Sequence, residues 1–257
     1  MELLIEGLNY KKHKRMDSII KNINQIHQRM NAACVRANRN PEEVKLLLAT
    51  KTVSADKIKL ALESGEHLIG ENKAQELKSK YDDLRDVPHD KHFIGHLQTN
   101  KIKELLRYDV SCIQSIDRID LAEKLQNRLL FEKKEINVFI QVNTSNEKSK
   151  FGVSPDQAIE LTKQVAEFPN IHIKGLMTIG LFSAEEKKVR KCFKKLKDIQ
   201  QEIASLGLPN VEVSELSMGM SHDLEFAIDE GSTMIRVGTA IFGKRMYADS
   251  YYWNEGV

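Results

Sequence analysis

A lysine follows directly after a short apolar run near the start of the chain. The run LLLAT, residues 46–50, has the composition of a buried strand, and Lys51 follows it with no polar break. A lysine held at such a strand end is partly desolvated, so its pKa should fall from ~10.4. The neutral amine could then attack a carbonyl carbon and form a Schiff base. The alternative interpretation is an ordinary solvated lysine, as most lysines are.

Two glycine-containing segments late in the chain have the composition of an anion site. They are SELSMGMSHD (214–223) and IRVGTAIFG (235–243), and each follows or ends an apolar run. Glycine lets the backbone approach an anion, hydroxyl side chains donate to it, and a helix that begins there points its first amides at it. Either glycine alone could be only a turn, but the two together favour a phosphate. The residues concerned are Gly219, Gly238, Ser217 and Thr239.

An arginine lies within the last apolar run, STMIRVG (232–238). Alternate residues of a strand face opposite sides, so Arg236 points into the sheet interior if Ile235 and Val237 pack against helices. A buried arginine needs a partner. It could donate to a ligand atom, or it could form an ion pair with an inward carboxylate such as Glu71, and the sequence leaves both open.

Together, a carbonyl-reactive lysine, a phosphate cradle and an arginine describe a site for pyridoxal 5′-phosphate. The aldehyde would bond Lys51, and Arg236 would face the pyridine nitrogen. His92 and His96 could share one strand face, but two histidines with no further ligand are usually structural, so we expect no metal. Nothing in the residues predicts a catalytic group beyond the cofactor-binding set.

Short apolar runs alternate along the chain with longer amphipathic runs that begin at Ser, Asn or Asp. Alternating strands and helices give a parallel sheet, and eight such units in ~250 residues predict an α/β fold, a closed (β/α)8 TIM barrel. An open doubly wound sheet is the competing architecture, but its glycine-rich first turn is missing from residues 50–56. The eight expected strands are 44–50, 66–70, 91–95, 111–116, 136–143, 171–179, 211–218 and 232–238.

An additional helix should precede the barrel, because residues 14–38 carry apolar residues at helical spacing and Asn40-Pro41 ends the pattern. We therefore expect residues 1–257 to form a single pyridoxal-phosphate-binding domain. Residues 1–40 would be its N-terminal extension and helix, and the barrel would occupy about 44–245.

Composition excludes several classes of protein. Lys and Arg number 39 and Asp and Glu 37, a net charge of +2, which argues against nucleic-acid binding. No apolar run approaches the ~20 residues of a membrane span, and the N-terminal apolar patch precedes its charges, the reverse of a secretory signal. The three cysteines form no CxxC motif, which favours a reducing compartment. We expect a cytoplasmic protein.

Seven motifs, in order along nearly the whole chain, resemble those of the pyridoxal phosphate homeostasis protein family, which itself resembles the N-terminal barrel of alanine racemase. The motifs are LLLATKTV (46–53), IGENKAQE (69–76), HFIGHLQTNK (92–101), KFGV (150–153), GLMTIG (175–180), LSMGMSHDLEFAI (216–228) and GSTMIRVGTAIFG (231–243). The resemblance implies a barrel that binds pyridoxal phosphate and takes part in its intracellular homeostasis.

The resemblance also assigns individual residues. It implies that Lys51 is the Schiff-base lysine, that Arg236 lies beside the pyridine nitrogen and that Asn72 lies near the cofactor ring. The phosphate contacts that it implies come from Ser217, the Met218 backbone, Gly238 and Thr239.

The same resemblance favours a cofactor carrier over an enzyme. Alanine racemase takes one acid/base tyrosine from a second, β-rich domain, and we expect that domain to be absent because the chain ends about twenty residues after the last strand. Nothing places Tyr247, Tyr251 or Tyr252 at the barrel mouth. The alternative is a low-activity amino-acid (alanine) racemase. Apoenzymes that use the cofactor are possible partners, and loss of the second domain favours a monomer.

Overall fold

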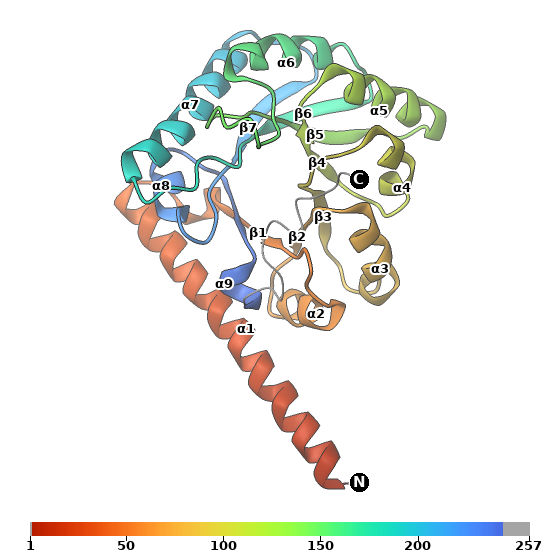
Figure 1. The fold of residues 1–257 in the computed structure, drawn as a ribbon, viewed down its shortest axis with the longest axis vertical. Coiled ribbons are helices and arrows are strands. Elements are labelled where there is room, and N and C mark those ends of the chain that lie inside the picture. Colours follow the sequence, from red (N-terminus) through yellow and green to blue (C-terminus); the bar gives the residue numbers. More distant parts are fainter. Residues whose placement is uncertain (1, 244–257) are drawn as a thin grey trace.

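The computed structural model describes the backbone of residues 2–243 and the side chains of residues 18–243. Its centre is a closed barrel of eight parallel strands in sequential order, which confirms the predicted α/β barrel (Figure 1). The strands are β1 (Lys45–Ala49), β2 (Leu68–Glu71), β3 (Asp90–Phe93), β4 (Cys112–Ile116), β5 (Ile136–Gln141), β6 (Ile171–Met177), β7 (Val211–Ser217) and β8 (Met234–Val237).

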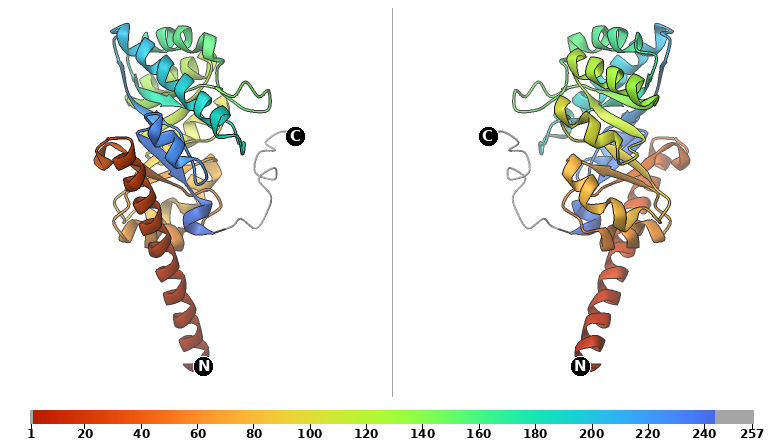
Figure 2. Two further views of the ribbon diagram at one scale, coloured as in Figure 1. Left: turned by 90° about the vertical axis from the view of Figure 1, so that its left-hand side faces the viewer. Right: turned by 90° about the vertical axis from the view of Figure 1, so that its right-hand side faces the viewer.

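Helices follow the strands and surround the barrel (Figures 1 and 2). The helix α4 follows β3 as the alternating pattern requires, but its five residues are too few to show a helical period in the sequence. The helices are α1 (Glu2–Arg36), α2 (Ala55–Glu63), α3 (Ala74–Leu84), α4 (Ile102–Leu106), α5 (Ile119–Glu132), α6 (Ala158–Ala166), α7 (Glu186–Ser205), α8 (Leu224–Asp229) and α9 (Thr239–Phe242), with short 3₁₀ turns at Pro41–Glu43, Thr99–Lys101 and Pro155–Gln157.

Glycines end two of the predicted helices. Gly65 follows α2 and Gly207 follows α7, with φ angles of +108° and +59°, the left-handed region that ends many helices. At the start of α3, Lys73 is the N-cap, so Asn72 remains with the end of β2.

The core has two layers, one on each face of the barrel wall. Outside, the strands pack against the helices, and residues such as Ile235 and Val237 belong to this layer. Inside, a smaller apolar cluster fills the barrel, as the two-residue period of the strands requires. Its buried members are Leu47, Leu68, Cys112, Phe139, Met177 and Met234.

The first helix is longer than the sequence pattern indicated, since it begins at Glu2 rather than near residue 14. Its C-terminal half lies along the barrel, and its N-terminal half extends beyond it (Figures 1 and 2). The packed half is tied to the segments that follow β7 and β8. Arg29 makes two bonds to the Glu225 carboxylate in α8 at 2.7 and 2.9 Å, and the Asn22 amide donates to the carbonyl of Ile241 in α9 at 2.9 Å.

No helix in the described part of the chain is both long enough and apolar enough to cross a membrane. The tail that contains Tyr247, Tyr251 and Tyr252 lies outside the described residues. Residues 244–245, the end of the expected barrel range, lie outside them as well.

Candidate cofactor-binding site

Lys51 lies two residues beyond the end of β1, at the C-terminal mouth of the barrel, where its side chain is partly buried. Leu47 of the same strand belongs to the interior cluster, and the strand period places residue 51 on the same side. Thr50 is fully buried, whereas Thr52 is exposed and has a left-handed φ of +63°. The structure therefore places Lys51 where β/α barrels carry their functional groups, as the sequence predicted.

The strands on both sides of β1 bring two more predicted residues to Lys51. β1 lies between β8 and β2 in the barrel. Gly238 follows β8 so closely against β1 that an added Cβ would stand 2.7 Å from the carbonyl oxygen of Ala49. Asn72 follows β2, is partly buried, and packs so tightly that a Cβ on Gly95 would collide with its backbone. Gly238 and Asn72 thus flank the lysine.

The end of β7 supplies the next group of predicted residues. Ser217 is fully buried, and Gly219 has a φ of +94°, which a residue with a side chain rarely adopts. The Met218 amide donates to the carbonyl of Met234 at 3.2 Å, and the Met218 carbonyl accepts from the Ser232 hydroxyl at 2.7 Å. Both main-chain groups of Met218 are thus bonded within the protein, and its phosphate contact stays a prediction.

Helices begin after both β7 and β8, as the sequence predicted. After β8, Thr239 is the exposed first residue of α9, and Gly238 is its N-cap. After β7, Asp223 is the N-cap of α8, and its carboxylate accepts from the amide of Met220 at 2.6 Å. Burial raises the pKa of Asp223, and the Met220 amide and the Arg236 charge oppose that rise. These turns give the mouth a set of backbone amides and hydroxyls beside a cation.

Arg236 points into the barrel, as the alternation in β8 predicted, and its side chain is buried. One guanidinium nitrogen donates to the Ser217 hydroxyl and another to the carbonyl of Thr178, each at 2.8 Å. Burial lowers the pKa of Arg236 to about 10, and the charge of Asp223 opposes that shift. The guanidinium is therefore a buried cation held by two neutral acceptors.

The alternative partner considered for Arg236 is wrong. Glu71 lies on the outer face of β2, where it forms an ion pair with Lys80 of α3 at 2.7 Å. Among the described residues, Arg236 makes no ion pair within 4 Å. An unpaired buried cation favours an electron-rich ligand atom beside it.

A chain of hydrogen bonds continues from Arg236 across the barrel interior. The Ser217 hydroxyl donates to the side-chain carbonyl of Gln114 in β4 at 2.6 Å. The Gln114 amide nitrogen lies 2.7 Å from Nδ1 of His92 in β3. Burial, assisted by the charge of Lys45, lowers the pKa of His92 to about 4, so His92 is neutral and accepts this bond. We call these four residues, Arg236, Ser217, Gln114 and His92, the inner network.

The second histidine of the predicted pair makes different contacts at the rim of the mouth. His96 stacks on Phe151, which belongs to the loop after β5, with 3.8 Å between ring centroids. His96 also lies 3.7 Å from the Asp117 carboxylate. Among the described side chains, no group of three or more His, Cys, Asp or Glu residues could hold a metal ion.

Sequence reasoning missed several residues that support the site. The Thr178 carbonyl accepts a hydrogen bond from Arg236, and the Gln114 side chain accepts one from Ser217. Each of these two residues lies in an apolar run and looks like an ordinary strand residue in the sequence. Lys80 and Glu76 contact the neighbours of Lys51 from α3. Their spacing of four residues on a predicted helix was a visible signal, although it is usually a solvated ion pair.

The fold and the site define a barrel of the alanine racemase type. The family model described as alanine racemase, N-terminal domain, matches residues 15–246. The structure of alanine racemase from Clostridium difficile 630 superposes with a TM-score of 0.71 and covers 91% of this chain and 58% of that one. Its sequence identity is 12%, so it shows the fold alone.

More similar proteins narrow the family. The pyridoxal phosphate homeostasis protein of Aquifex aeolicus is 41% identical over 225 residues, which are 88% of this chain and 97% of the relative. The structure of PipY from Synechococcus elongatus PCC7942 with PLP bound is 30% identical, with a TM-score of 0.74, and covers 85% of this chain and all of that one. The chain belongs to the pyridoxal phosphate homeostasis protein family.

Proposed function

We propose that this protein binds pyridoxal 5′-phosphate at the barrel mouth, with Lys51 as its covalent anchor, and serves in the intracellular homeostasis of that cofactor. One observation carries the proposal. A lysine at the end of β1 lies beside β8, which supplies a buried, unpaired arginine and one glycine turn, and β7, next to β8, supplies a second glycine turn. The printed names of the relatives, and the PLP bound to PipY, support the same ligand.

Lys51 contributes an amine nitrogen to the proposed linkage. When bound, the cofactor supplies an aldehyde carbon, which forms a Schiff base with a lysine. The nitrogen lone pair forms the new bond, and the aldehyde oxygen leaves as water with the two amine hydrogens. The step requires the neutral amine of Lys51.

The buried guanidinium of Arg236 fits the pyridine nitrogen of the same ligand. A neutral pyridine nitrogen is a hydrogen-bond acceptor, and Arg236 still has donors beyond the two that it uses on Ser217 and Thr178. Arginine remains charged, so it disfavours a proton on the ring nitrogen. A ring held in this state is a weak electron sink, which favours holding the cofactor over turning over a substrate.

The turns after β7 and β8 fit the phosphate. Gly238 leaves no room for a side chain against β1, and Gly219 adopts a backbone conformation suited to glycine. We assign the phosphate to these turns and the cofactor ring to the neighbourhood of Asn72. The proposed phosphate contacts, which the family resemblance implies, are Ser217, the Met218 backbone, Gly238 and Thr239. Hydrogen bonds to the phosphate from Ser217 and from the Met218 amide would replace their present bonds to Gln114 and Met234.

The described residues favour a carrier over a racemase. Racemisation needs an acid/base group on each face of the substrate carbon. The two tyrosines whose side chains are described, Tyr81 and Tyr108, pack against each other in the helix layer with ring centroids 5.3 Å apart. Neither can therefore serve at the mouth.

Several further properties belong to the same proposal. We propose that residues 1–257 form a single domain, that the protein is a cytoplasmic monomer, and that apoenzymes that use the cofactor receive it from this protein. The closed barrel supports the single domain, and the relatives named for pyridoxal phosphate homeostasis support the apoenzyme partners.

The first experiment is an absorbance titration of the purified protein with pyridoxal 5′-phosphate, beside Lys51→Ala. We expect the long-wavelength band of a lysine–aldehyde linkage in the wild-type protein and its loss in the variant. Reduction with borohydride followed by peptide mass spectrometry should place the cofactor on Lys51. A variant with the wild-type band would overturn the assignment.

The same preparation tests the competing activity. We expect no conversion of L-alanine to D-alanine above the rate of free pyridoxal phosphate. Robust conversion that disappears in Lys51→Ala would replace the carrier with a racemase.

A further inference from the structure

The two peptide groups that meet at the Cα atom of Lys51 are both held from outside the barrel. The carbonyl oxygen of Thr50 accepts a hydrogen bond from Lys80 Nζ at 2.9 Å. The amide of Thr52 donates to Glu76 Oε2 at 2.7 Å. Both partners belong to α3, so one helix fixes the peptide planes before and after the lysine.

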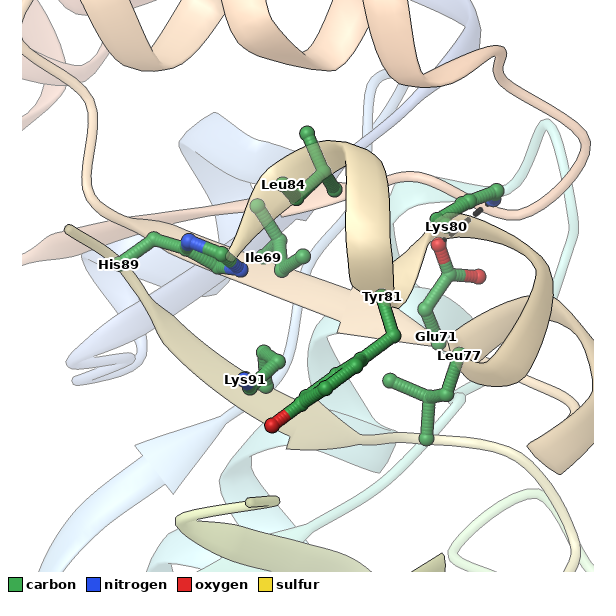
Figure 3. A pocket seen from close by; sticks show the side chains of 8 residues that line it. All are labelled: Ile69, Glu71, Leu77, Lys80, Tyr81, Leu84, His89 and Lys91. Carbon is green, nitrogen blue, oxygen red and sulfur yellow. Dashed lines mark hydrogen bonds and ion pairs between the residues drawn. The ribbon is translucent and has the colours of Figure 1, made fainter. Parts of the chain in front are cut away.

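Lys80 has no donor left for any other group. Its ammonium donates to Thr50 O, to Glu71 Oε1 at 2.7 Å and to Glu76 Oε2 at 2.8 Å, and an ammonium has three hydrogens. The residue is buried, at 8% exposure. Figure 3 shows Lys80 directed at the Glu71 carboxylate. Three acceptors in fixed directions leave the Lys80 head group a single orientation.

Glu71 joins the same arrangement to the strand that carries Lys51. Its side chain is 1% exposed, and its Oε1 accepts from the Thr50 hydroxyl at 2.7 Å as well as from Lys80. We call the group formed by Glu71, Glu76 and Lys80 the outer clamp. Tyr81, His89 and Lys91 line the small pocket beside it (Figure 3).

The backbone at Thr52 shows why such a clamp is needed. A β-branched residue rarely adopts a left-handed φ of +63°. Backbone strain of this kind persists only where the surroundings hold it in place. The bond from Thr52 to Glu76 supplies that restraint one residue after Lys51.

We propose that Lys80 and Glu76 are positioning residues for Lys51. By holding the Thr50–Lys51 and Lys51–Thr52 peptides, they fix the direction in which the Lys51 side chain leaves the backbone toward the barrel mouth. The inference rests on the proposed function, in which Lys51 bonds the cofactor aldehyde. Its specific consequence is that the clamp affects formation of the covalent bond and leaves the phosphate turns, on the opposite side of β1, unaffected.

Two ligands distinguish an effect on the covalent bond from an effect on phosphate binding. Pyridoxal 5′-phosphate has the aldehyde, whereas pyridoxamine 5′-phosphate has an aminomethyl group in its place and cannot bond a lysine in this way. We would measure the rate of covalent bond formation by absorbance, and the affinity of both ligands by calorimetry, for Lys80→Met. The matched control is Lys78→Met, an exposed lysine of the same helix.

For Lys80→Met we expect a covalent rate at least about tenfold lower, because small displacements of a reacting group are costly. Its affinity for pyridoxamine 5′-phosphate should stay within about twofold, and Lys78→Met should match the wild type. Equal weakening of both ligands, or no change in either, would overturn the positioning role.

A second pair of variants covers the case in which Lys80→Met fails to fold. Glu76→Gln keeps an acceptor for the Thr52 amide, whereas Glu76→Ala removes it. The Ala variant should slow covalent bond formation at least about threefold relative to Gln. Equal rates would contradict the clamp. A Lys51→Ala variant that keeps the absorbance band would instead refute the proposed function, whatever the clamp variants show.

Discussion

The inner network and the outer clamp are two buried polar groups that support one site from opposite faces of the barrel wall. Inside, neutral side chains extend from Arg236 toward β3, and the chain ends at His92. Outside, two carboxylates share the single ammonium of Lys80. Both groups are largely buried, but only the outer clamp sets acidic groups against a cation.

The difference appears in how each region binds protons. Burial lowers the pKa of His92 to about 4, which keeps the imidazole neutral. Burial raises the pKa of Glu71 to about 8, and the positive charge of Lys80 opposes that rise. In both regions burial favours the uncharged form, which for a base means losing a proton and for an acid means keeping one. The two regions should therefore respond to pH in opposite directions.

The largest expected effect is on acid stability through His92. Between pH 6.5 and about 4 the unfolded chain binds a proton that the folded protein does not bind, so stability falls as pH falls through this range. The full loss is about 3 kcal/mol, since each pKa unit corresponds to ~1.4 kcal/mol. In His92→Gln, whose side-chain carbonyl can still accept from Gln114, this part of the pH dependence should disappear.

Urea unfolding at a series of pH values measures this effect, and only the difference between wild type and variant is used. His67→Gln is the matched control, because that histidine is exposed. If His92→Gln and the wild type had parallel stability profiles, the histidine would be charged in the folded state and the inner network would not be neutral.

The next effect concerns the cation of the inner network. Arg236→Met should weaken binding of pyridoxal 5′-phosphate by about tenfold to a hundredfold, the range for hydrogen bonds to a charged group. The cofactor-free protein should lose no more than about 1 kcal/mol of stability, because an unpaired buried charge is itself destabilising. Arg190→Met is the contrast, since Arg190 pairs with Glu186, Asp229 and Glu230.

Calorimetry with pyridoxal 5′-phosphate and urea unfolding of the cofactor-free variants decide whether Arg236 serves the ligand or the stability of the barrel. Arg190→Met should leave binding unchanged. A loss of several kcal/mol in Arg236→Met, with cofactor affinity preserved, would show that the arginine serves the barrel rather than the ligand.

The inner network could be predicted from the sequence in part, because it follows from the period of the strands. Alternation in β8 was enough to turn Arg236 inward and Ile235 outward, and both predictions are confirmed. The partners of Arg236 could not be predicted, since they depend on which strands face each other across the closed barrel. Ser217 and Gln114 meet although 103 residues separate them.

The outer clamp could not be predicted, for a different reason. The expected second strand ended at Gly70, whereas β2 continues to Glu71 and turns that side chain outward. Side chains of a strand alternate between its two faces. Whether β2 includes residue 71 therefore decides whether the Glu71 side chain faces Arg236 inside the barrel or Lys80 outside it. Composition was enough to tell which segments form helices and which form strands, but not the residue at which each one ends. The outer clamp depends on the residue at which β2 ends.

An effect of opposite sign to that of His92 should come from Glu71. Between pH 4.5 and about 8 the folded protein holds a proton that the unfolded chain has lost, so stability falls as pH rises. Relative to Glu71→Gln, the wild type should lose stability progressively from pH 5 to pH 8. Glu63→Gln, an exposed glutamate, should follow the wild type. A wild type that gained stability over this range relative to Glu71→Gln would mean that Lys80 outweighs burial.

The smallest effect separates the two causes of the His92 shift. Burial is the larger cause, and the charge of Lys45, which pairs with Glu215 at 3.1 Å, adds to it. In Lys45→Met the pKa of His92, followed by NMR of the imidazole, should rise but stay below 6.5, because burial is unchanged. A return to 6.5 would mean that charge repulsion alone keeps His92 neutral. The inner network would then depend on a nearby charge, as the outer clamp does, and the contrast between the two regions would not hold.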